Sequence, residues 1–197
     1  MNKAFYISVF VFIISALSRL AFVSIPNFTP MVAMALVGGA FFNRKLGFLI
    51  PLLSMLLGDF VLALVLGGNY SSYLFGPSMA FVYFSLFCVY ALGYFQRKKL
   101  QDASNSHFQT SLLASTLFFL ISNFGAWLSI PFYDKTIFGL AQCYLAGLSF
   151  FEGNIFANFF LNLSLSTLIF YFALHRFCSV AFKKALIGEK QRNFTKS

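Results

Sequence analysis

Residues 46–66 read LGFLIPLLSMLLGDFVLALVL and carry one charged side chain, Asp59. A helix of this length spans about 31 Å, which matches the roughly 30 Å hydrocarbon core of a bilayer. Membrane barrel strands alternate polar and apolar residues over about ten positions, whereas this stretch is continuously apolar. It therefore predicts a membrane-spanning α-helix.

The composition extends this prediction to the whole chain. Of its 197 residues, 59% are hydrophobic and only 10% are charged, whereas a soluble domain carries about 25% charged residues. We expect an all-α integral membrane protein with a single transmembrane domain over 1–180 and a basic cytoplasmic tail over 181–197. The expected spans are about 4–24, 30–42, 46–66, 77–95, 111–130 and 155–175.

The N-terminus resembles a signal peptide, because Lys3 is followed by an apolar run. That run extends to about Val23 and has no clear small-residue cleavage site. Its length exceeds a signal-peptide core, so we interpret it as an uncleaved first helix.

The basic residues predict the orientation. With six spans, twelve of the fourteen Lys and Arg residues lie on one side, and the exceptions are Arg19, inside the first span, and Lys135. Basic loops stay in the cytoplasm, so both termini are expected there. Because the positive charges flank apolar segments, the net charge of +9 indicates topology and not a nucleic-acid partner.

Two segments are too short to cross alone. Residues 136–151 (TIFGLAQCYLAGLSFF) are expected to form an interfacial or re-entrant segment on the outer face, within a lid over 131–153. The second span, 30–42, covers about 20 Å, so residues 25–29 either dip into the membrane as irregular backbone or connect to a tilted helix. Irregular backbone at that depth must line a cavity or be buried in protein.

Polar side chains inside the spans concentrate in the outer halves, about 5–11 Å below the surface. Polar groups in hydrocarbon are costly and usually functional, so their shared depth indicates a pocket open to the outside. The candidate substrate-binding residues are Arg19, Asn27, Asp59, Asn123, Trp127, Tyr144, Asn158 and Asn162.

Each candidate also has a purely structural explanation. Arg19 and Asp59, the two charges expected inside the spans, would form an ion pair between the first and third helices if they do not bind a ligand. Asn123, Asn158 and Asn162 would form interhelical hydrogen bonds, Asn27 would lie in an ordinary proline-rich loop, and Trp127 and Tyr144 would be ordinary interfacial aromatics.

Catalytic motifs are absent from the sequence: it contains no GxxxxGK[ST], HExxH or GxSxG pattern, so we expect neither an enzyme nor a resident cofactor. The three cysteines are scattered, with no CxxC spacing. Cys88 is interpreted as a small buried hydrophobic residue, or as a thiolate metal ligand if the substrate is a cobalt corrinoid.

Several motifs carry a resemblance over roughly residues 19–165. They are NFTP within 26–30, ALVGGA at 35–40, LGD at 57–59, SNFGAWL at 122–128 and CYLAGLSFF at 143–151. The chain resembles a family of uncharacterised bacterial membrane proteins, which is similar to the S-components of energy-coupling-factor (ECF) vitamin transporters.

The resemblance implies a location in a bacterial inner membrane, six helices, cytoplasmic termini and an outward-facing vitamin pocket. It also implies a partner ATPase and transmembrane energising module. A relative of that fold is a solitary cobalamin transporter whose cysteine ligates cobalt, a part that Cys88 would play here. The chain has Ala157-Asn158 where the family is expected to carry Gly-Asp, so an acidic group is missing there.

Three functions follow as hypotheses. The first is capture of a vitamin-sized molecule, with a cobalamin-like ligand as the specific case. The second is a structural or assembly protein without a small ligand. The third is a membrane enzyme using Asp59 as general base, which requires Asp59 to face a cavity without pairing to Arg19.

Overall fold

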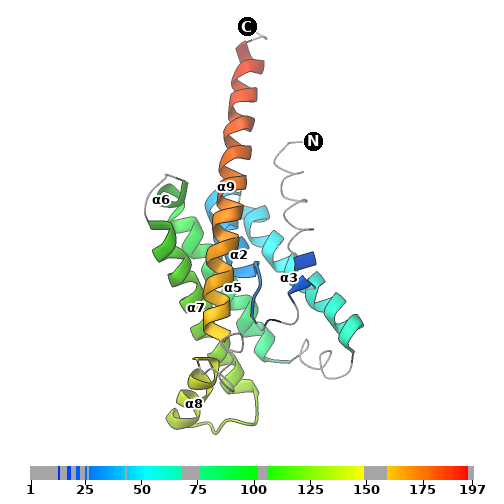
Figure 1. Ribbon diagram of the computed structural model, residues 1–197, viewed down its shortest axis with the longest axis vertical. Coiled ribbons are helices and arrows are strands. Elements are labelled where there is room, and N and C mark those ends of the chain that lie inside the picture. Colours follow the sequence, from blue (N-terminus) through cyan, green and yellow to red (C-terminus); the bar gives the residue numbers. More distant parts are fainter. Residues whose placement is uncertain are drawn as a thin grey trace.

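The computed structural model describes residues 13, 17–18, 21–22, 25, 27–42, 44–67, 76–101, 106–148 and 159–194, and the side chains of all of these except 44, 66, 106 and 181–194. All regular elements in these ranges are helices (Figure 1). They are α2 (Met31–Phe41), α3 (Arg44–Leu66), α5 (Ser78–Phe95), α6 (Arg97–Gln101), α7 (Ser106–Ser129), α8 (Ile137–Leu148) and α9 (Phe159–Phe194).

The all-helical prediction is confirmed for the described part of the chain, and four of the helices are long and apolar enough to cross a membrane. These spans are Lys45–Val65, Ser78–Phe95, His107–Ser129 and Phe159–Val180. Two shorter apolar helices, α2 and α8, accompany them. The expected first span, 4–24, lies mostly outside the described residues.

The outward face of α3 is apolar and exposed, which indicates what surrounds this helix. Large apolar side chains recur along it at helical spacing and are between 42% and 70% exposed. They are Leu49, Leu53, Leu56, Phe60 and Leu64. A continuous apolar stripe of this kind is unusual on a soluble protein and marks an interaction surface, which for a helix of spanning length is lipid.

Helix α9 continues well past residue 175, where the sequence predicted its end. Between 159 and 194 there is no proline and only one glycine, Gly188, so nothing in this stretch stops a helix. The apolar span ends at Val180, and the remainder projects beyond the other helices (Figure 1).

Helix α2 occupies the centre of the bundle, where it contacts α3, α5, α6, α7 and α9. Ten of its eleven residues, Met31 to Ala40, are buried. Close backbone contact explains its glycines: a Cβ at Gly38 would lie 2.3 Å from the Gly47 carbonyl oxygen, and one at Gly39 would lie 2.2 Å from that of Tyr90. The two glycines of the ALVGGA motif therefore serve helix packing.

Two side chains of α6 bond to the carboxyl end of α2. Arg97 donates from Nε to the Ala40 carbonyl oxygen at 2.9 Å and from a terminal nitrogen to that of Phe42. Gln101 donates to the Ala40 oxygen at 2.7 Å. These bonds satisfy carbonyls that a helix end leaves without partners, so α2 is fixed along the bundle axis.

Candidate functional site

A cavity of about 480 Å³ lies between α2, α3, α5, α7 and the first turns of α9. Its volume falls in the range of about 300–1,000 Å³ that is usual for small-molecule sites. Most of the described wall is apolar and rich in phenylalanine and methionine. These side chains are Phe22, Phe28, Phe118, Phe119, Phe159, Met31, Met55 and Met79.

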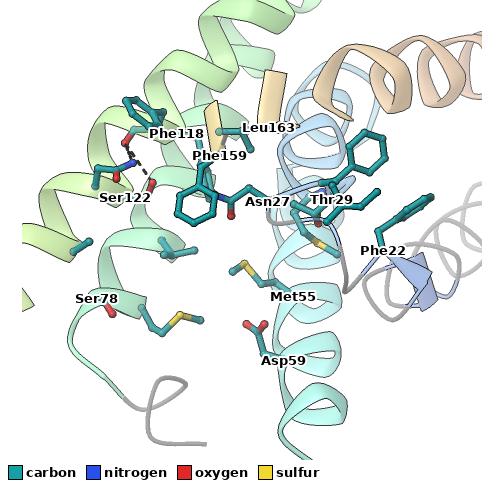
Figure 2. Close-up of a pocket in the computed structure, with 18 of the residues that line it drawn as sticks. Phe22, Asn27, Thr29, Met55, Asp59, Ser78, Phe118, Ser122, Phe159 and Leu163 are labelled. Atoms are coloured by element: carbon teal, nitrogen blue, oxygen red, sulfur yellow. Dashed lines mark hydrogen bonds between the residues drawn. The ribbon is translucent and has the colours of Figure 1, made fainter. Parts of the chain in front are cut away.

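Six polar side chains interrupt the apolar wall, namely Asn27, Thr29, Asp59, Ser78, Ser122 and Asn123. Among the described lining residues Asp59 is the one ionisable group, and it is 1% exposed. Figure 2 shows Asp59 and Met55 projecting from α3 into the space bounded by Ser78, Asn27 and Phe159. A carboxylate buried so deeply requires charged or donor groups around it.

The cavity lies at one end of the bundle. Its wall uses the amino-terminal ends of α2, α5 and α9 and the carboxyl-terminal halves of α3 and α7. The basic residues lie at the other end: Lys45 is at the amino-terminal end of α3, and Arg97–Lys99 are in α6, directly after the carboxyl end of α5. Among the described residues, the polar wall and the basic residues therefore lie at opposite ends of the bundle. The sequence predicted this arrangement, because the polar side chains lie in the halves of the spans that are far from the basic loops.

The turn before α2 brings Asn27 and Thr29 to the cavity. Asn27 has a φ of 56°, a left-handed conformation in which asparagine is enriched among non-glycine residues. The N-cap of α2 is Pro30, which has no side-chain cap bond. The Thr29 hydroxyl, one residue earlier, accepts a hydrogen bond from the Met31 backbone N–H at 3.4 Å, which satisfies one of the N–H groups that a helix start leaves without partners. Asparagine and threonine at these positions therefore let the chain enter a buried helix directly beside the cavity.

On α7, Ser122 and Asn123 bond to their own helix. The Asn123 side-chain nitrogen donates to the Phe119 carbonyl oxygen at 2.9 Å, and the Ser122 hydroxyl donates to the same oxygen at 3.4 Å. These bonds hold both side chains against α7, where they form one polar edge of an otherwise apolar wall.

Trp127 and Tyr144, two predicted binding residues, are not part of the described lining. The Trp127 indole donates from Nε1 to the Asp134 carbonyl oxygen at 2.8 Å, and Lys135 donates to the carbonyl oxygens of Trp127 and Ile130. The Tyr144 hydroxyl donates to the Leu120 carbonyl oxygen at 2.8 Å. Trp127 thus holds the 131–136 turn against α7, and Tyr144 holds α8 against α7.

The remaining candidates fall elsewhere. Asn162 is 3% exposed on α9 and is not among the residues that line the cavity. Cys88 lies six residues beyond Val82, the last α5 residue in the wall, which is about 9 Å along the helix. Arg19 and Asn158 lie outside the described residues. Of the eight predicted binding residues, the cavity therefore brings together Asn27, Asp59 and Asn123.

Sequence reasoning missed three polar wall residues, Thr29, Ser78 and Ser122, and the apolar wall. Ser122 begins the SNFGAWL motif, and Ser78 follows Pro77 at the start of a span. Both serines lie in the outer half of a predicted span, so extending the search for polar residues in the outer halves to hydroxyl side chains would have found them. Phe118 and Met55 carry no such signal, because an apolar side chain facing a cavity has the same sequence pattern as one in the core.

The described ranges hold no group of three or more His, Cys, Asp or Glu side chains arranged to bind a metal ion. No curated protein matches the chain, and no solved structure does either. A family model matches residues 1–185, which is nearly the whole chain. The chain belongs to this family, DUF6580, a family of unknown function.

Proposed function

We propose that this protein is a bacterial inner-membrane substrate-binding protein of the S-component type, which captures a vitamin-sized molecule in the cavity beside Asp59. One observation carries the proposal: a cavity of about 480 Å³ with apolar walls and a few polar groups, Asp59 among them. Small-molecule sites generally combine these features. A scaffold would instead bury its polar side chains in a dry interface.

The topology of the proposal has six spans. Helix 4–24 is the first, and α2 with the preceding 25–30 segment is the second. The positive-inside rule places both termini and the basic ends of the helices in the cytoplasm, so the cavity opens outward. The outer segment that contains α8 lies at the membrane interface as part of a lid over 131–153.

Asp59, Asn27 and Asn123 are the proposed polar contacts among the described residues, and Arg19 and Asn158, outside those residues, remain proposed contacts on the sequence alone. The phenylalanines and methionines supply the apolar surface. The sequence contains no P-loop, so inward release depends on a partner ATPase module. Cobalt ligation by Cys88 is not part of the proposal, because Cys88 lies outside the cavity wall.

The test is mass spectrometry of small molecules that co-purify with the protein in mild detergent. We expect a molecule in the wild type that is depleted at least tenfold in Asp59→Asn, a change that keeps the side-chain shape and removes the charge. Lys99→Ala removes an exposed charge at the opposite end of the bundle and should retain the molecule. Equal retention by folded Asp59→Asn and wild type would contradict the assignment of the site.

A further inference from the structure

Helix α8 packs behind the cavity without lining it. Its buried residues are Gly139, Cys143 and Gly147, which are spaced four apart and therefore share one face of the helix. Two bonds fix this face against α7: the Tyr144 hydroxyl bond to the Leu120 carbonyl oxygen at 2.8 Å, and the Cys143 thiol bond to that of Asn123 at 3.4 Å.

This register places Gly147 directly behind two wall residues, Phe119 and Asn123. A Cβ added at Gly147 would lie 2.7 Å from Cε2 of Phe119 and 3.3 Å from Oδ1 of Asn123. The first distance is shorter than carbon atoms tolerate, since van der Waals contact between carbons lies near 3.5–4.0 Å. Any side chain at 147 therefore displaces the Phe119 ring.

The ring is enclosed on the sides away from the cavity. Phe160 packs against Phe119 with ring centroids 5.0 Å apart, and Tyr144 does so at 5.9 Å. Phe119 is 6% exposed and lines the cavity, so the open space next to it is the cavity itself. A displaced ring moves into that space.

We infer that Gly147 on α8 sets the upper size limit of the ligand. Because glycine has no side chain, the Phe119 ring can pack against α8 and does not extend further into the cavity. This inference rests on the proposed function and deepens it: size selection is controlled from outside the wall. Gly147 is a positioning residue, which acts through Phe119 and touches no ligand.

The test measures cavity width with thiol reagents of two sizes. Ser122→Cys, in a Cys88→Ala background, places a thiol in the wall, and peptide mass spectrometry reads its modification. The probes are aminoethyl methanethiosulfonate and its larger biotinylaminoethyl analogue. With Gly147→Ala added, we expect the large reagent to react at least fivefold more slowly while the small one changes less than twofold.

Two further variants separate positioning from general damage. Gln142→Ala introduces the same residue on an exposed position of α8 and should leave both rates unchanged. Phe119→Leu, which shortens the displaced side chain, should restore the large reagent's rate in the Gly147→Ala background. Alanine favours helix over glycine by about 1 kcal/mol, so Gly147→Ala should not unwind α8.

The outcomes separate this inference from the proposed function. Equal slowing of both reagents, or no slowing of the large one, would overturn the role of Gly147 while leaving the cavity intact. Failure of even the small reagent to reach the thiol in the parent protein would contradict the accessible cavity on which the proposed function depends.

Discussion

Arg97 is a residue whose side chain joins two parts of the chain that are distant in sequence. Its guanidinium binds the carbonyl oxygens of Ala40 and Phe42 and lies 5.4 Å from the centre of the Tyr94 ring. A cation at the carboxyl end of a helix is favourable, because the exposed carbonyls carry partial negative charge.

Replacing Arg97 by alanine should therefore loosen the end of α2. Hydrogen bonds to charged groups contribute about 1.5–3 kcal/mol, and because Arg97 is partly exposed we expect a loss near the lower end of that range. Thermal unfolding in detergent measures it. Lys99→Ala removes a neighbouring exposed charge and should have little effect; similar losses in both variants would show that net charge, and not the cap, is responsible.

Trp127 was predicted to bind substrate because of its position near the outer end of a span, but its side chain holds the following turn. Its indole holds the Asp134 carbonyl oxygen, so Trp127→Phe should loosen the 131–136 turn. One lost neutral hydrogen bond amounts to about 1 kcal/mol, and we expect faster hydrogen exchange in this turn by roughly fivefold. Exchange in α5 serves as the internal reference and should stay unchanged.

At the scale of elements, α2 depends on close contact with α5. A Cβ at Gly93 would lie 2.2 Å from the Leu36 carbonyl oxygen, which belongs to backbone and cannot rotate away. Gly93→Ala should therefore cost about 1–3 kcal/mol, as overpacking does, and lower the midpoint of thermal unfolding by several degrees.

The matched control is Ala80→Gly, which exchanges the same two residue types at an exposed position of α5. It should cost no more than about 1 kcal/mol, the difference in helix propensity. If Gly93→Ala is as stable as the wild type, the close crossing of α2 and α5 is not a determinant of the fold.

The elements differ in how far the sequence predicted them. The helices expected at 46–66 and 77–95 match α3 and α5 within two residues. Basic residues or a proline border these apolar runs and mark where each helix begins or ends. The end of α9 was not predicted, since hydropathy reports where an apolar span stops and not where a helix stops. Helix α6 has five residues, too few for a periodic signal.

For the site, the position of a residue along its predicted span located the polar residues at the right end of the bundle. It did not predict whether each side chain points into the cavity. Asn27, Asp59 and Asn123 line the cavity, whereas Trp127 and Tyr144, although near the same end, bond to backbone oxygens of Asp134 and Leu120. Which way such a side chain turns depends on partners distant in sequence, and no local pattern encodes them.

At the scale of the whole molecule, the account requires the two ends of the bundle to face opposite sides of the membrane. Helix α8 lies at one end and the projecting part of α9 at the other (Figure 1). A reporter enzyme active only in the cytoplasm should therefore work when fused after Ser197 and fail when inserted in the 131–136 turn. Activity at both positions would contradict the six-span orientation.

The central claim is an outward-open cavity, and sided thiol labelling of Ser122→Cys in the Cys88→Ala background tests it most directly. Ser85→Cys, at a fully buried position of α5 outside the cavity wall, is the control. In intact cells, a membrane-impermeant thiol reagent should modify Cys at position 122 and spare position 85. Modification of position 122 only when the cytoplasmic face is exposed, in inside-out vesicles, would contradict the account.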